Sequence, residues 1–392
     1  MNKKEIAEIK KQFKPDNDLF VINRVATCCV TRRSEILYKS VRKFAGFAAD
    51  SKKDYIPTLE CDQYLDIFKK TLSGSIGKSL IEFEFPYEQE QNNGAQVKLY
   101  NLLKDGFKDE DMVNDYIQYI IDNYDEPSDY TIIMAHCTYS VPNKNDNDEH
   151  DEADDTEVFN FILASICPMG LGDMCLFYNE DEKELTHKPN TEKIAKPPIA
   201  GFMFPTFDDR AADVNHVLYF SKNAKEPIKK IVEDVLGCTF GLTSEDEKTI
   251  FNNLLTKVAA TSKGTAAPAV PYEVAQNVHS QITDIVLKSS AESETPKLTK
   301  TQIKKIFQES GVDEDKLENF DETYKSIVGD TMELKAVNVI DTSKMGIKSP
   351  DVVVNVKSTK SDKVSAQIIN GKKCLVICLD EDVEINGLNV KV

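Results

Sequence analysis

The sequence lacks the segments that would place a protein in a membrane or an export pathway. No stretch of its 392 residues approaches the ~20 consecutive apolar residues of a membrane-spanning helix. Charged residues, among them Lys3, Glu5 and Glu8, occupy the N-terminal positions where a signal peptide needs an apolar core. We therefore expect a cytoplasmic protein with no membrane segment.

Paired cysteine motifs are also missing. The nine cysteines are an odd number, and none forms a Cys-x-x-Cys motif. Metal-binding cysteines normally come with a second pair or with histidines, so we expect reduced thiols in the hydrophobic core. Cys374 and Cys378 lie on one face of a predicted strand, and the same interpretation is preferred for them.

Positive charge is scarce. The chain has 48 basic and 66 acidic residues, a net charge of −18. This balance opposes binding to naked DNA or RNA, which depends on neutralising phosphates. It is compatible with a local basic face, and it suits a basic protein partner or a cation-rich assembly.

The N-terminal half alternates strand-like and helix-like patterns. A short amphipathic helix ends before Pro15, and the runs that follow switch between β-branched segments and segments with apolar residues at helical spacing. We predict an α+β or α/β domain with a mixed sheet over residues 1–222. Its main strands are expected at 19–31, 80–85, 130–139, 158–167 and 199–204, and its main helices at 59–72 and 110–124.

A helical region is predicted over residues 223–330. Ser244 and Glu247 have the spacing of a capping box that opens a helix, and Gly237 ends the helix before it. Two low-complexity stretches, 259–271 and 288–297, are expected to be flexible linkers. The remaining helices are predicted at 272–287, 299–310 and 313–328.

The last segment, residues 331–392, is predicted to be a small antiparallel β module. Asn370-Gly371 and Asn386-Gly387 each lie between strand-like flanks. Asn-Gly readily adopts the two positive φ angles of a type I′ turn, so each pair predicts a β-hairpin.

Four familiar functional motifs fail on composition or geometry. Gly77-Lys78-Ser79 lacks the earlier glycine of a phosphate-binding loop and follows a helix rather than a strand. His136 and Cys137 are adjacent in a strand and point to opposite faces, whereas His136 with Cys167 stays geometrically possible. The predicted helices 299–310 and 313–328 resemble a helix-turn-helix, but the second is acidic and would be repelled by phosphate.

The fourth motif is the acidic insert, residues 143–157, which carries eight acidic side chains and one lysine. No register supplies the glycine of an EF-hand loop. A solvated loop is the preferred interpretation, with a weak cation site as the alternative.

The most informative segment follows an apolar run that ends near residue 204. Asp208, Asp209, Arg210 and Asp213 come next, with His216 one turn further if the segment is helical. Because carboxylates at a strand end can bind a metal or transfer protons, these five are the candidate catalytic residues, and Asp209, Asp213 and His216 are the candidate metal ligands. The preferred alternative is structural: Asp208 caps a helix and Arg210 pairs with Asp213.

Several segments together resemble an uncharacterised family of cytosolic Firmicute proteins, catalogued as a domain of unknown function. The similar segments are residues 1–10, 68–74, 84–86, 204–210 and 374–377. The resemblance extends over essentially the whole chain and implies a bacterial, cytoplasmic protein. Because no activity is attached to the family, it implies no functional residues.

The absence of a complete catalytic motif, the acidity and the linkers predict a non-enzymatic binding or adaptor protein. We expect its partner to be a protein or ribonucleoprotein, plausibly a basic one, and we predict no cofactor. The alternative is a metal-dependent hydrolase of phosphoesters, using a divalent metal at Asp208, Asp209, Asp213 and His216. That alternative requires these side chains to converge in a concave pocket with His136 or His187.

Overall fold

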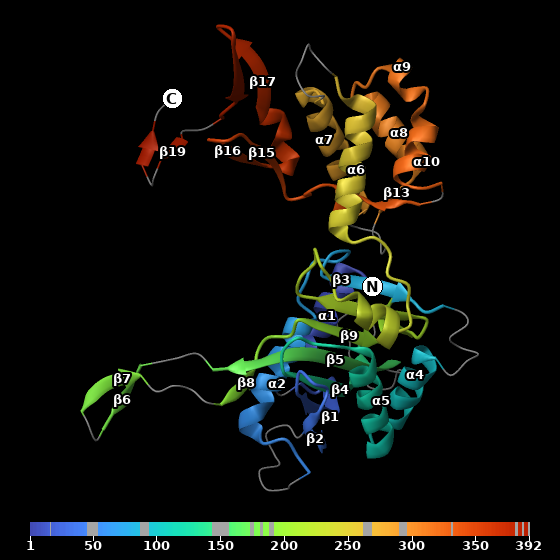
Figure 1. Ribbon diagram of the computed structural model, residues 1–392, viewed down its shortest axis with the longest axis vertical. Coiled ribbons are helices and arrows are strands. Elements are labelled where there is room, and N and C mark those ends of the chain that lie inside the picture. The colour runs from blue at the N-terminus through green and yellow to red at the C-terminus, as the bar shows by residue number, and fades with distance from the viewer. Residues whose placement is uncertain are drawn as a thin grey trace, which may run out of the picture. The chain divides into compact units, whose positions relative to one another are not determined.

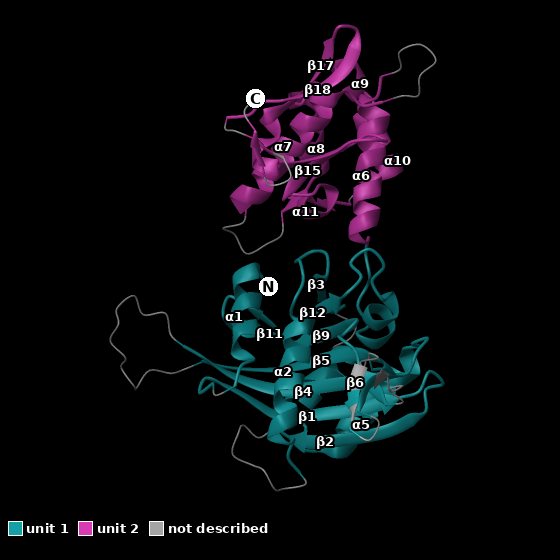
Figure 2. Cartoon of the chain, turned by 90° about the vertical axis from the view of Figure 1, so that its left-hand side faces the viewer, with its two compact units in different colours: residues 1–241 teal, residues 242–392 magenta. Residues whose placement is uncertain are grey.

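The computed structural model describes residues 1–15, 17–44, 54–86, 94–142, 157–172, 176–180, 183–187, 192–261, 269–289, 296–330, 332–380, 383–385 and 388–390. Most of the acidic insert and the central parts of both predicted linkers lie outside these ranges. The chain divides into two compact units, residues 1–241 and 242–392 (Figure 2). The boundary lies beyond residue 222, because the η1 turn (Ile231–Val235) contributes side chains to the core of the first unit.

An antiparallel sheet forms the centre of the first unit (Figure 1). Its strand order is β2-β1-β4-β5-β9-β12-β3, with β8 paired to one end of β5. The α+β alternative is therefore confirmed, and the described pairings of the sheet are antiparallel. The strands are β1 (Phe20–Val30), β2 (Ile36–Lys43), β3 (Leu80–Glu84), β4 (Tyr130–Val141), β5 (Glu157–Leu171), β8 (Lys193–Ala195), β9 (Ala200–Phe204) and β12 (His216–Ser221).

Both faces of the central strands of this sheet are buried. Alternate residues of β4 enter different cores: Ile132 and Met134 belong to one, and Ile133 and Ala135 to the other. Helices α4 (Ala95–Asp105) and α5 (Glu110–Asn123) contribute to the first core. Helices α1 (Lys3–Gln12) and α2 (Thr58–Thr71) contribute to the second core. Burial on both faces explains why β4 is an almost continuous apolar run.

The helices of the second unit surround a separate core that contains Phe251, Phe307, Phe320 and Tyr324. Ion pairs from Lys300 and Lys304 to Asp321 also link α8 to α10. The helices are α6 (Ser244–Ala259), α7 (Tyr272–Ser289), α8 (Lys300–Glu309), α9 (Glu314–Leu317), α10 (Phe320–Ile327) and α11 (Ala336–Val339).

Three local predictions in this unit are wrong. The capping box of α6 is Thr243 with Asp246, one position before the predicted pair. The predicted helix 313–328 is divided into α9 and α10. The predicted β-rich segment 331–340 contains α11, because the aliphatic side chains of Ala336 and Val339 pack into the helical core. Next to it, the short strand β14 (Leu334–Lys335) pairs with β13 (Lys297–Leu298).

Two-stranded hairpins follow the helices. They are β15 (Lys344–Lys348) with β16 (Val353–Lys357), β17 (Val364–Ile369) with β18 (Lys372–Ile377), and β19 (Val383–Ile385) with β20 (Leu388–Val390). The 3-10 turn η2 (Ser358–Lys363) connects β16 to β17. Asn370 and Gly371 have φ angles of 51° and 76°, which confirms the first predicted turn. Asn386-Gly387 lies outside the described residues, but the flanking strands pair. Over the described ranges, no helix has the length and apolar character needed to cross a membrane.

Candidate functional site

The predicted catalytic segment is a β-hairpin rather than the start of a helix. Strand β10 (Thr206–Asp208) pairs with β11 (Ala211–Asp213), so Asp209 and Arg210 form the turn. Their φ angles are 44° and 64°, a left-handed conformation that is unfavourable for residues other than glycine. The expectation that Asp208 caps a helix is therefore wrong.

Helix α1 holds this turn in place. The Arg210 guanidinium donates from Nη1 to both carboxylate oxygens of Glu8, at 2.9 and 3.2 Å, and from Nη2 to the Pro142 carbonyl. The Tyr139 hydroxyl donates to the same Glu8 carboxylate at 2.9 Å. The Asp209 amide donates to Glu5 at 3.1 Å. Arg210 thus pairs with Glu8, not with Asp213 as expected, because the hairpin directs it toward α1.

The other candidate residues also have local partners. Asp213 Oδ2 lies 2.6 Å from Nδ1 of His216, and its Oδ1 accepts a hydrogen bond from the Asn215 amide at 2.9 Å. Asp208 Oδ1 lies 3.9 Å from the amino group of Met1, which also forms an ion pair with Glu82 at 2.6 Å. The contacts of Asp213 are local, whereas those of Met1 connect it to residues that are distant in the sequence.

The candidate carboxylates do not form a metal-binding group. Across the described ranges, no set of three or more His, Cys, Asp or Glu side chains is arranged to hold a metal ion. His136 is engaged elsewhere: its Nε2 lies 3.0 Å from the Leu103 carbonyl and its Nδ1 lies 2.9 Å from the Asn23 amide nitrogen. Burial lowers the pKa of His136, so its ring is neutral near pH 7.

The buried cysteines are poor nucleophiles. Burial raises the pKa of Cys28 to about 11 and that of Cys167 to about 12, and it raises the pKa of Cys137 well above its ordinary value. Because the thiolate is the reactive form, these thiols are inert near neutral pH. His136 and Cys167 also face opposite sides of the sheet, since Cys167 belongs to the α1–α2 core and His136 contacts Phe107 of the other core. The His136–Cys167 pair is therefore excluded.

The prediction that the cysteines lie in the hydrophobic core is wrong for some other thiols. Cys378 is exposed, and Cys29 and Cys374 are half-buried. Cys374 lies on β18, which pairs with β17 and, among the described strands, with no other. Cys175 lies outside the described residues.

The Gly77-Lys78-Ser79 turn cannot cradle a phosphate. It connects α2 to β3, in the order helix then strand. The Gly77 amide donates to the Leu80 carbonyl at 2.8 Å, and the Ser79 amide donates to the Ser75 carbonyl at 2.9 Å. Since a phosphate-binding loop needs free amides pointing at the ligand, this segment is a connecting turn.

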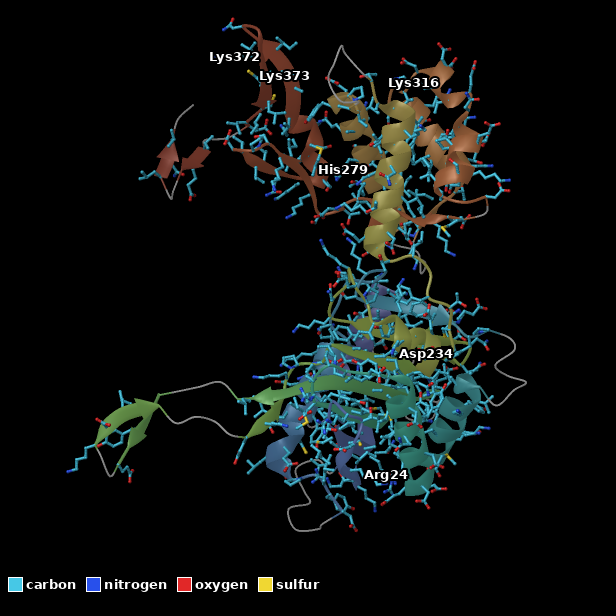
Figure 3. The ribbon with its side chains drawn as sticks, in the orientation of Figure 1. Arg24, Asp234, His279, Lys316, Lys372 and Lys373 are labelled. Atoms are coloured by element: carbon cyan, nitrogen blue, oxygen red, sulfur yellow. The ribbon has the colours of Figure 1, made fainter. Side chains whose placement is uncertain are left out.

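The exposed apolar side chains point to a different candidate site. Eight of the 22 large hydrophobic side chains that are exposed in the described residues lie between positions 352 and 388. In the β17–β18 hairpin, Ala366 pairs with Leu375 and Ile368 pairs with Lys373, so these side chains share one face. Ile368 is 76% exposed and Leu375 is 42% exposed. Figure 3 labels Lys372 and Lys373, which follow the turn at the hairpin tip.

The sequence patterns identify neither the contacts between α1 and the 208–213 hairpin nor the exposed face of the β17–β18 hairpin. Glu5 and Glu8 fit an ordinary amphipathic helix, and nothing in their spacing indicates that they bind the 208–213 hairpin. Ile368 and Leu375 have the alternation of a half-buried strand, which predicts a covered face. The signal that could have identified the second site is the two-residue Asn370-Gly371 turn. It joins two strands directly into a hairpin, and an isolated two-stranded hairpin brings no covering layer of its own.

Comparisons with known proteins identify a family but no characterised relative. A family model described as "Domain of unknown function (DUF4317)" matches residues 1–388. None of the curated proteins and none of the solved structures compared with the chain matches it significantly.

Proposed function

We propose that this chain, which belongs to the family described as "Domain of unknown function (DUF4317)", is a non-enzymatic adaptor of the bacterial cytoplasm. In this proposal the second unit binds a protein or ribonucleoprotein partner through the β17–β18 hairpin. A basic partner would also be attracted by the net charge of −18.

The uncovered apolar face of the hairpin is the observation that carries this proposal. An isolated two-stranded hairpin is marginally stable in water, and a third strand or a helix against its apolar face would stabilise it. Val364, at the base of β17, is covered, and its carbonyl accepts a hydrogen bond from Tyr272 at 3.1 Å. Ile368 and Leu375 extend beyond this support and are exposed, and Ile377, which pairs with Val364 at the base, is exposed as well. A partner that packs on them removes apolar surface from water.

The geometry does not favour the hydrolase alternative. Asp213 is hydrogen-bonded to His216, and the residues around Asp209 and Arg210 are tied to α1. A metal-dependent hydrolase needs carboxylates directed at one open position. In the described part of the chain, the carboxylates of Asp208 and Asp213 contact different neighbours instead, and Asp209 contacts Glu5 through its backbone amide.

Affinity capture from native cells, with quantitative mass spectrometry, tests the adaptor proposal. We expect the wild-type protein to retain a defined set of partners and the variant Ile368→Ser/Leu375→Ser to lose them. The matched control is Leu59→Ser/Val158→Ser, which removes exposed apolar side chains from the first unit and should keep the partners. Circular dichroism of each variant verifies the fold.

Two results would overturn the proposal. One is capture of the same partners, at the same level, by the hairpin variant. The other is metal-dependent hydrolysis of a phosphoester by the purified protein that is lost in Asp209→Ala and retained in the hairpin variant. The second result would establish the hydrolase instead.

A further inference from the structure

A groove of about 570 Å³ lies on the second unit, and Tyr272, one of its lining residues, also donates a hydrogen bond to the Val364 carbonyl at the base of β17. Helix α6 lines it with Phe251 and Leu255, one turn apart, and helix α7 lines it with Ala275 and His279 at the same spacing. Its third wall is β15. Figure 3 labels His279 in this part of the unit. The Nε2 atom of His279 lies 3.1 Å from the Asp341 carbonyl, which connects α7 to the segment before β15.

The groove follows an open edge of β15. All five residues of this strand, 344–348, line the groove. Because successive side chains of a strand point to opposite faces, a wall made of consecutive residues is the edge of the strand rather than one face. The strand β15 pairs with β16 and, among the described residues, with no other strand. The His279 ring reaches the backbone of Lys344, so the second edge is available for pairing from Met345 onward.

The floor of the groove is apolar. Phe251, Leu255, Ile340 and Met345 line it and are at least nine-tenths buried, so each presents a small part of its surface to the groove. Ile347, two residues along β15 from Met345, lies on the same strand face and is half-buried. An aliphatic side chain that enters the groove would contact this floor.

The rim of the groove is basic. Lys248, Lys344 and Lys348 line it and are exposed, and none of them forms an ion pair with the residues that the structure describes. Asp341 is the acidic residue of the lining, and its carboxylate accepts hydrogen bonds from Ser343. Burial lowers the pKa of His279, so this ring adds no charge at neutral pH. The rim therefore carries a net positive charge.

The spacing of these lysines decides what kind of ligand fits. Lys344 and Lys348 are four residues apart on one strand, roughly 13 Å at about 3.3 Å per residue. One carboxylate or phosphate group cannot meet both ammonium groups unless the two long side chains lean toward each other along the strand. An extended peptide with acidic side chains at every second position can, because its side-chain repeat matches that of β15.

We propose that this groove binds an extended segment of a partner protein in which aliphatic and acidic residues alternate, and that the segment pairs with the open edge of β15. Its aliphatic side chains contact the floor, and its carboxylates meet Lys248, Lys344 and Lys348. The inference rests on the proposed adaptor function, and it adds a second contact that is chemically distinct from the β17–β18 face.

Fluorescence anisotropy with the full chain tests this inference. The probe is a labelled short peptide in which valine alternates with glutamate, compared with the same peptide carrying lysine in place of glutamate. We expect the acidic peptide to bind and the basic one not to bind. The variant Lys248→Glu/Lys344→Glu/Lys348→Glu should bind the acidic peptide about tenfold or more weakly, and the wild-type affinity should fall as salt is added.

Two controls separate this inference from the adaptor proposal. Lys257→Glu changes an exposed lysine of α6 outside the groove and should bind the peptide like the wild type. Ile368→Ser/Leu375→Ser, which tests the hairpin, should also leave peptide binding unchanged. If the hairpin variant loses its partners and the wild type does not bind the peptide, the peptide-binding proposal for the groove is overturned and the adaptor proposal is retained.

Other occupants of the groove give other results. Equal binding of the peptide to the wild type and the triple variant would overturn the proposal. So would dimerisation of the wild type in analytical ultracentrifugation that the triple variant lacks, because a second copy of the chain would then be the occupant. Tight binding of a free dicarboxylate that displaces the peptide would assign the groove to a small anion.

Discussion

Arg210 and Glu8 form an ion pair between residues that are 202 positions apart in the chain. The guanidinium of Arg210 lies 2.9 Å from one carboxylate oxygen of Glu8, and the two side chains are 23% and 26% exposed. Arg210 is also a turn residue with a φ angle of 64°. The contact therefore stabilises a residue in an unfavourable backbone conformation and gives this charged side chain a structural role.

This pair predicts an order of stability among variants. Arg210→Ala should lower the free energy of unfolding by about 1–2 kcal/mol, since it removes a mostly buried ion pair and keeps the left-handed strain. Arg210→Gly should cost about 1 kcal/mol less than Arg210→Ala, because glycine adopts positive φ freely. Urea denaturation followed by circular dichroism measures both. Equal stability of the two variants would contradict a strained turn.

The same pair predicts coupling between its members. In a double-mutant cycle, Arg210→Ala and Glu8→Ala should be non-additive by about 0.5–1.5 kcal/mol. Lys225→Ala, an exposed residue of the first unit outside this pair, serves as the control and should be additive with Glu8→Ala. Full additivity of the Arg210 and Glu8 substitutions would show that the ion pair contributes nothing.

His136 should titrate below its ordinary pKa of 6.5. Its Nε2 must donate to the Leu103 carbonyl, which only accepts, so Nδ1 accepts from the Asn23 amide. Because the folded pKa is depressed, stability is fully present above pH 6.5 and decreases as pH falls toward the folded pKa. Nitrogen NMR of the ring measures the tautomer and the midpoint. A midpoint above 6.5 would contradict this arrangement.

Glu247 predicts a pH dependence of the opposite sign. Its carboxylate accepts hydrogen bonds from the Lys335 amide at 2.9 Å and from Asn338 at 3.1 Å, but burial raises its pKa above the ordinary 4.5. The folded state then binds the proton more tightly than the unfolded state, so stability decreases as pH rises above 4.5 through the folded pKa. Glu247→Gln keeps an acceptor without the charge.

We therefore expect Glu247→Gln to be more stable than the wild type at neutral pH, with the difference disappearing as pH falls to 4.5 and below. Thermal unfolding across this pH range measures the difference. Glu245→Gln, on the same helix and exposed, is the control for loss of one surface charge. A constant difference at every pH would show that the Glu247 carboxylate is not the titrating group.

The cysteines should differ in reactivity. Cys378 is exposed and Cys374 half-buried, whereas burial raises the pKa of Cys28 and of Cys137. Brief alkylation of the native protein, followed by peptide mapping, should modify Cys378 first and leave Cys28 and Cys137 unmodified. In urea all of them should react. Modification of Cys28 as fast as Cys378 would mean that the first unit opens readily.

The sequence by itself determined the features that depend on neighbours in the chain. Apolar and β-branched runs predict β1 and β4, and apolar residues at helical spacing predict α5, each to within a few residues, because such patterns report which faces are buried. The Asn370-Gly371 turn follows from the φ angles that these two residues tolerate. The capping box of α6 was predicted one residue too late, since Ser244 and Thr243 offer the same kind of oxygen.

Only the tertiary structure decided what the charged and exposed residues do. Asp209, Arg210 and Asp213 have the composition of a catalytic cluster, and the β10–β11 pairing directs them to separate partners. Ile368 and Leu375 alternate like core residues, and no covering layer is packed on them within the described residues. Both outcomes depend on contacts between distant segments, and local residue preferences do not encode which segments meet.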